Sequence, residues 1–150
     1  MIKEINMSIE WAPLGFESAM SMEVRDNTLG ETSVLDSSAP FNVAVRFEIP
    51  PPVVPTLGGS FRIRVYAESV GPGEEKQIGA TALVPVTGAA AYTTVIAVPA
   101  GTLTGEGAAS GGVIVSGVYK LVAVLQHLNP GPNEVSGYAE STGLIQIRTP

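Results

Sequence analysis

The chain contains no cysteine and few basic residues, and both shortages exclude classes of function. Because cysteine is absent, disulfides, thiolate zinc sites, thiol nucleophiles and thiolate-held iron–sulfur clusters cannot form. Eight basic residues stand against 14 acidic ones, for a formal net charge of −6, so the basic footprint that phosphate contact requires is missing. We therefore predict that the protein does not bind nucleic acid.

Long apolar runs are also missing. No stretch approaches the roughly 18 consecutive apolar residues that a membrane-spanning helix needs, so we predict no membrane span. Near the start, Glu4, Asn6 and Ser8 come before any apolar region forms, which is unlike a secretory signal. The sequence thus predicts a cytoplasmic protein, with removal of a leader or export by another route as the alternatives.

Reactive side chains that could converge on a substrate are scarce. His127 is the single histidine, no G-x-S-x-G segment exists, and a proline turn beside His127 predicts a solvated or turn-capping loop residue. Glu74 and Glu75 are neighbours on a Gly-Pro-Gly loop, where adjacent side chains point apart, so they do not form the carboxylate pair of a glycosidase. Residues 101–107 lack the G-K-[ST] of a phosphate loop, and residues 108–112 are interpreted as a flexible connection. We expect no enzyme, no metal ion and no cofactor.

Hydrophobic residues make up 45% of the 150 positions, and their spacing predicts β-strands. Residues 41–49 alternate strictly between apolar and polar side chains, and residues 61–68 repeat the pattern. Further candidate strands cover residues 5–11, 19–25, 78–86, 92–98, 113–125 and 136–148. Because no segment shows a capped pattern with a helical period, we expect these eight strands and little or no helix.

Short strands with turn-rich joints predict an all-β fold. A parallel sheet needs long crossovers, usually helical, and no joint here has a helical pattern. Residues 50–59 are interpreted as a corner between two strands, because proline cannot donate to a ladder. We predict one antiparallel β-sandwich domain of about 7–9 strands over residues 1–150. Its N-terminal strands and a loop occupy residues 1–40, and the core sandwich occupies residues 41–148.

One segment carries a family resemblance. Residues 116–125, Ser-Gly-Val-Tyr-Lys-Leu-Val-Ala-Val-Leu, resemble the penultimate strand of immunoglobulin-like and fibronectin type III-like domains. The resemblance implies that Tyr119 forms a tyrosine corner, followed by core residues at every second position. The turn at residues 129–133 and the segment 143–148 are similar to the last hairpin of those domains. Covering roughly residues 41–148, the resemblance implies an immunoglobulin-like sandwich but no function by itself.

Antiparallel order sorts the loops into two ends of the molecule. The first end, proline-rich and nearly neutral, collects the loops at residues 13–17, 50–59, 87–91 and 127–134. The second end, which is acidic, collects the loops at residues 27–40, 71–77 and 99–112. Solvated loops are the plain interpretation of the acidic end and cation binding is the alternative, but no EF-hand spacing supports calcium.

Two sets of apolar residues are candidates for contact with a partner protein. The first set, at the proline-rich end, is Val53, Val54, Leu57 and Leu128; these side chains either touch a partner or fold back over the end of the core. The second set, Val118, Val122 and Val124, lies on the face of its strand opposite the core face and is more apolar than a solvent-facing strand should be. Either the N-terminal segment with Trp11 and Phe16 covers that face, or a second subunit does.

The sequence favours a non-catalytic structural or protein-interaction module, self-associating as a homo-oligomer or belonging to a larger assembly. Its predicted partner-binding residues are the two apolar sets just described. The alternative function is a small-ligand or carbohydrate-binding module that uses loops at the proline-rich end, with Tyr138, Asn129 and Asn133 as ligand-binding residues. Aromatic residues, which glycan-binding surfaces need, are only 6% of the chain and weaken that alternative.

Overall fold

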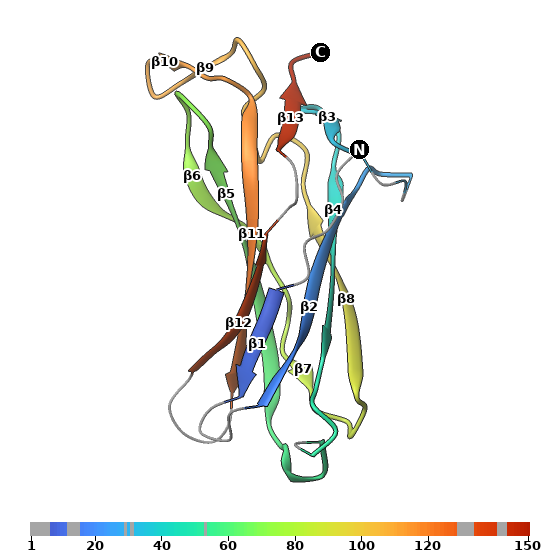
Figure 1. Ribbon diagram of the computed structural model, residues 1–150. Coiled ribbons are helices and arrows are strands. Elements are labelled where there is room, and N and C mark those ends of the chain that lie inside the picture. Colours follow the sequence, from blue (N-terminus) through green and yellow to red (C-terminus); the bar gives the residue numbers. More distant parts are fainter. Residues whose placement is uncertain are drawn as a thin grey trace.

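The computed structural model describes residues 7–11, 16–28, 30, 32–52, 54–128, 134–140 and 144–150 and is all-β (Figure 1). Its strands are β1 (Met7–Trp11), β2 (Phe16–Arg25), β3 (Val34–Asp36), β4 (Phe41–Glu48), β5 (Ser60–Ser69), β6 (Glu75–Ala80), β7 (Val84–Pro85), β8 (Ala91–Val98), β9 (Ala109–Ser110), β10 (Val113–Ile114), β11 (Val118–Leu128), β12 (Glu134–Glu140) and β13 (Ile145–Arg148). Among the described residues the only helical element is one 3-10 turn, η1 (Val54–Thr56). The predicted fold class is confirmed.

The strands form two layers packed face to face (Figure 1). One layer has the order β1-β2-β4-β8, the other has the order β12-β11-β5-β6, and neighbours within each layer are antiparallel. At one side the layers join where β1 meets β12, through the pair Ile9 and Gly137. Of the strand pairs in the described chain, only that of β3 with β13 is parallel.

The core lies between the layers and is built from alternating residues, as the sequence predicts. Alternate positions of β5 and β11 are buried, and their other positions are half-buried or exposed. Aromatic rings from three strands meet in this core, with the Phe47 ring 4.9 Å from that of Phe61, edge-on, and 5.2 Å from that of Tyr92, stacked. These contacts hold β4, β5 and β8 together across the sandwich.

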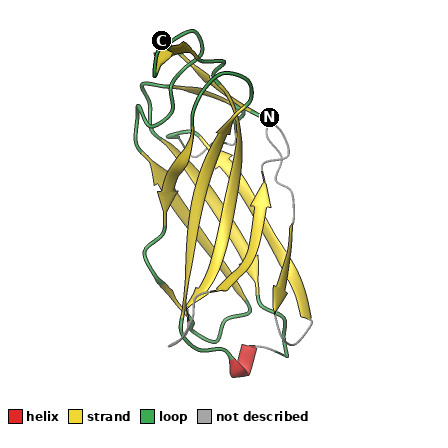
Figure 2. Ribbon diagram, turned by 90° about the vertical axis from the view of Figure 1, so that its left-hand side faces the viewer, coloured by secondary structure: helices red, strands yellow, loops and turns green. Residues whose placement is uncertain are grey.

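The proline-rich segment between β4 and β5 is a corner, as predicted. The chain leaves β4 at Glu48, makes the 3-10 turn η1 and enters β5 at Ser60. Figure 2 shows this turn at the lower tip of the molecule. The amide of Val54 donates to the carbonyl of Pro50, at 3.3 Å, which closes the turn without needing a proline N–H.

Three predicted strands are each divided in two. Residues 78–86 fall into the end of β6 and into β7, and residues 136–148 fall into β12 and β13. Residues 113–125 are divided between β10 and β11, because Gly117 has a left-handed φ of 72° that interrupts the extended backbone. The alternation of apolar and polar residues continues across such a backbone break, so the sequence predicts one strand where the structure has two.

The interpretation of residues 108–112 as a flexible connection is wrong. Strand β9 pairs with β10 as a hairpin in which Ser110 lies opposite Val113. The two loop residues, Gly111 and Gly112, have φ values of 58° and 80°, as a type I′ hairpin turn requires at both positions. The glycines therefore make a tight turn, and the hairpin stands apart from the main sheet at one end of the molecule (Figure 1).

The loops gather at two ends in the order that antiparallel strands predict (Figure 1). At the proline-rich end, the amide of Ile49 donates to the carbonyl of Ala90 and the amide of Val86 to that of Gly59. At the other end, the amide of Glu106 donates to the carbonyl of Ile147. These bonds join segments that are far apart in the sequence.

Candidate interaction surfaces

The outer face of β11 is covered in part by the next strand. Val122 and Val124 are half-buried. In the antiparallel pairing of β11 with β5, Tyr66 lies opposite Val122 and Arg64 lies opposite Val124. Residues directly opposite on antiparallel strands share a face, and long side chains such as these shield an apolar neighbour while keeping a polar tip in water. Side chains of β5 thus shield Val122 and Val124 in part, which the sequence alone did not indicate.

The N-terminal strand does not lie across that face. Strand β1, which ends at Trp11, and strand β2, which begins at Phe16, take places within the sheet, with β12 between β1 and β11. The alternative in which this segment covers Val118, Val122 and Val124 is therefore not supported by the described strands. Contact of these valines with a second subunit stays a prediction.

A substitution tests how the outer face contributes to stability. We expect Val122→Glu to leave the protein folded and to lower the free energy of unfolding by about 1 kcal/mol, because the apolar neighbour of Tyr66 is lost and the new carboxylate stands opposite Glu140 in the register of β11 and β12. The matched control is Val65→Glu on β5, where the side chain is 0% exposed and a buried carboxylate should unfold the domain. Urea denaturation measures both, and unfolding of the Val122 variant would place this residue in the core instead.

At the proline-rich end, the predicted partner-binding residues lie over the end of the core. Val54 and Leu57 are half-buried and pack against the core cluster, so for these two the folding-back interpretation is borne out. Leu128 is half-buried at the end of β11, and Val53 lies outside the described residues. The described residues of this end therefore offer less free apolar surface than the composition of its loops indicates.

His127 lies on β11 rather than in a loop, which corrects its predicted location. Its Nε2 is 2.8 Å from the carbonyl oxygen of Gly58, and its ring centre is 5.2 Å from that of Phe61. The histidine thus caps the end of the proline-rich corner, in keeping with the turn-capping interpretation. Of the predicted ligand-binding residues, Asn129 and Asn133 lie outside the described residues, and Tyr138 belongs to β12 with its side chain outside the description.

At the acidic end, Glu74 and Tyr119 hold the backbone of one residue, Thr104, in place from its two sides. Oε1 of Glu74 accepts the amide of Thr104 at 3.0 Å, and the buried hydroxyl of Tyr119 donates to the carbonyl of Thr104 at 2.9 Å. Burial raises the pKa of Glu74, but the Thr104 amide and the ammonium of Lys76, 3.4 Å away, outweigh it and keep the pKa below its usual value. Burial and the nearby Glu74 charge raise the pKa of Tyr119 to about 12. Glu74 therefore acts as a structural acceptor for the loop between β8 and β9.

Two aspartates, Asp36 and Asp26, take part in turns near this end. Oδ1 of Asp36 accepts hydrogen bonds from the hydroxyl of Ser38 at 2.7 Å and from its amide at 2.8 Å, and these bonds lower the pKa of Asp36. Oδ1 of Asp26 makes the corresponding bonds to Thr28. Such local bonds are typical of Asx turns. Within the described ranges, no three histidine or acidic side chains come together as a metal site would need.

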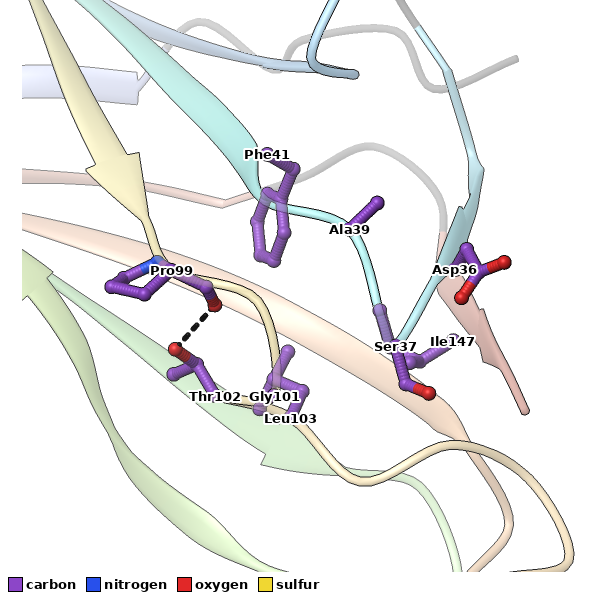
Figure 3. Close-up of a pocket in the computed structure, with 9 residues that line it drawn as sticks. All are labelled: Asp36, Ser37, Ala39, Phe41, Pro99, Gly101, Thr102, Leu103 and Ile147. Carbon is purple, nitrogen blue, oxygen red and sulfur yellow. Dashed lines mark hydrogen bonds between the residues drawn. The ribbon is translucent and has the colours of Figure 1, made fainter. Parts of the chain in front are cut away.

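Two cavities formed by described residues are too small or too open for a typical small-molecule site. One, lined by Phe41, Leu103 and Ile147 among others, measures about 10 Å³, which is room for one water molecule (Figure 3). Another is a hollow of about 230 Å³ on the outer face of β2, β4 and β8, where Ala44 and Thr93 lie among ion-paired arginines. Ligand pockets usually enclose about 300–1,000 Å³.

Large apolar side chains are exposed mainly at the acidic end, opposite to the prediction from composition. Seven such residues are exposed in the described chain: Val34, Val70, Leu83, Val95, Val113, Ile114 and Leu144. Five of them lie at the end formed by β3, the β9–β10 hairpin and β13, and Ile114 is the most exposed at 62% (Figure 1). We call this set, Val34, Val70, Val113, Ile114 and Leu144, the apolar tip. Sequence reasoning missed it because Val113 and Ile114 were placed in a continuous core strand.

Comparisons with known proteins assign no family to the chain. None of the described helical residues forms a segment long and apolar enough to cross a membrane. No protein-family model matches the sequence, and no curated protein matches it.

Proposed function

We propose that this protein is a non-catalytic, immunoglobulin-like module that contacts other proteins, including copies of itself, as a structural subunit. The strand order supports the immunoglobulin-like part of the proposal. Strands β2, β4 and β8 correspond to A, B and E of that fold, and strands β5, β11 and β12 correspond to C, F and G. Tyr119 at the start of β11 donates its hydroxyl to the carbonyl of Thr104, 15 residues upstream in the loop between β8 and β9, a bond similar to that of a tyrosine corner.

The apolar tip is the observation that carries the interaction role. Val113 and Ile114 are 47% and 62% exposed on a hairpin that is separate from the main sheet, so they add little to the core. Contiguous exposed apolar side chains with a polar surround mark contact surfaces in soluble proteins. Exposed charged residues, Glu75 and Glu106 among them, belong to the loops and strands of the same end.

A hairpin substitution tests this role. We expect Ile114→Glu to leave the unfolding midpoint within about 2 °C of the unchanged protein, because the side chain is exposed, and to weaken association by about tenfold or more. The measurement is the mass in solution by light scattering across a dilution series. Leu83→Glu, at a 57% exposed residue away from the tip, is the matched control and should leave the mass unchanged. Equal effects of the two variants, or none, would contradict a role for the apolar tip.

A further inference from the structure

Strand β8 is an unprotected edge of the sandwich. On one side it pairs with β4 along its whole length, from Ala91 opposite Glu48 to Val98 opposite Phe41. On its other side it pairs with no strand of the described chain. Figure 1 shows β8 at the outer border of its layer. Its sequence, AYTTVIAV, has no charge, no proline and a high content of β-branched residues.

The opposite edge of the main sheet, β6, carries the protection that β8 lacks. Glu75 and Lys76 are exposed charged residues within β6, and the pairing of β6 with β5 is irregular between Val65 and Tyr66. Charges and irregular pairing are the features by which natural edge strands avoid adding another strand. Strand β7 is two residues long and ends in Pro85. Among the described strands, β8 is thus the one long edge that is open to pairing.

The open part of β8 is its N-terminal half. Near its C-terminal half β6 approaches closely, since a Cβ on Gly79 would lie 2.6 Å from Cγ2 of Ile96. Thr93 and Val95 are exposed, Val95 at 50%. Beside Thr93 lies the hollow of about 230 Å³ over Ala44, and Arg46, the residue opposite Thr93 on β4, is one of the side chains that line it.

We propose that a second copy of this chain pairs antiparallel with β8 across a two-fold axis at Thr93. The inference deepens the proposed self-association and rests on it. In this arrangement Thr93 faces Thr93 of the second copy, Ala91 faces Val95 and Tyr92 faces Thr94, so no like charges are opposed. Although each copy has a net charge of −6, the contact strand itself is neutral, which keeps the repulsion away from the interface.

Closure explains why the partner is a second copy. Each copy has one long unprotected edge, and pairing the two across a two-fold axis leaves neither edge open. The β8 contact by itself therefore gives a dimer and not a filament. A short strand edge buries less area than a standard interface, so we expect dissociation in the micromolar range, visible on dilution.

The first experiment places a charge on the edge. We expect Val95→Lys to raise the dissociation constant of the dimer about tenfold or more, as lysine on an edge strand blocks pairing, and the exposed position should keep the fold intact. The matched control, Leu83→Lys, changes an equally exposed residue off this edge and should leave the constant unchanged. Light scattering across a dilution series measures both variants. Unchanged association of the Val95 variant would overturn the proposal, and so would a monomer at every concentration of the unchanged protein.

The second experiment uses the absence of cysteine from the chain. Thr93→Cys should form a disulfide-linked dimer on mild oxidation, because the two-fold axis places the new thiol next to its own copy, with no other thiol to compete. Lys76→Cys on the β6 edge is the control and should stay monomeric on a denaturing gel. A mass above that of two chains, or no cross-link at Thr93 in a sample that is dimeric, would overturn the two-fold arrangement.

The two proposals can fail separately. If Ile114→Glu abolishes association and Val95→Lys does not, the protein is an interaction module whose contact is the apolar tip, and the β8 pairing is wrong. If the reverse holds, β8 is the contact and the role of the apolar tip is wrong. If β8 instead binds an extended peptide from another protein, the unchanged protein alone stays monomeric. That result would also reject a second copy of this chain as the partner.

Discussion

Replacing Gly117 by alanine should lower the free energy of unfolding by about 3 kcal/mol, the largest effect we expect from a single methyl group in this protein. Gly117 has a left-handed φ of 72°, which costs any other residue energy. In addition, a Cβ at this position would lie 2.5 Å from the amide nitrogen of Glu106 and 2.7 Å from its Cα. Both contacts are to backbone, so they cannot be relieved by turning a side chain.

Gly107 supplies the matched control for this prediction. Its φ of 77° is nearly the same, but a Cβ there would meet nothing within 4 Å. We expect Gly107→Ala to lower the free energy of unfolding by only about 1 kcal/mol, the cost of the backbone conformation alone. Urea denaturation of the two variants therefore separates strain from close contact. Equal losses would mean that the approach of Glu106 to Gly117 contributes nothing.

The close approach at Gly117 has a structural purpose. The carbonyl of Gly117 accepts the amide of Ile147 at 2.7 Å, and the carbonyl of Ile147 accepts the amide of Glu106 at 2.8 Å. Three segments, the start of β11, the strand β13 and the loop after β8, are thus joined by backbone bonds at one point. A side chain at Gly117 would push the loop away and break these bonds together.

Period-two patterns predicted the core well because they depend only on which face of a strand is apolar. In β4 and β5, Phe47 and Phe61 were predicted on the inner faces, and both are fully buried. Backbone breaks escaped prediction, since residues 113–125 keep an apolar pattern across the turn at Gly117. Pairing partners also escaped it. That Tyr66 lies beside Val122 depends on a contact between strands more than fifty positions apart, which one sequence does not specify.

The candidate surfaces were harder to predict than the fold. Composition predicted a contact surface at the proline-rich end, because its loops contain apolar residues such as Val54 and Leu57. In the structure these two side chains pack on the core. Whether an apolar loop residue turns inward depends on the space that the end of the sandwich leaves, and this is a property of the whole fold. The open edge of β8 could not be foreseen either, because strand order decides which strand is last.

Removing the hydroxyl of Tyr119 should lower the free energy of unfolding by about 2 kcal/mol at neutral pH. Phenylalanine fills the same buried space, so the loss comes from the carbonyl of Thr104, which accepts this hydroxyl at 2.9 Å and would lose its partner. The loop from β8 to β9 would then be held at Thr104 only by Glu74, through the amide. Urea denaturation of Tyr119→Phe measures the loss, and Tyr66→Phe on the outer face is the control.

Alkaline pH provides a second and independent signature of the same bond. The pKa of Tyr119 is raised from 10.0 to about 12 in the folded protein, chiefly by burial and then by the Glu74 charge. Between pH 10 and pH 12 the unfolded chain has lost this proton while the folded chain keeps it, so the unfolded state binds fewer protons and stability falls as pH rises. The stabilisation is complete below pH 10 and is lost on approach to pH 12. Tyr119→Phe lacks this fall, so its stability curve should converge with that of the unchanged protein as the pH rises, whereas Tyr66→Phe should keep the fall. Parallel curves for Tyr119→Phe and the unchanged protein would show that this hydroxyl titrates equally in both states and does not clamp the loop.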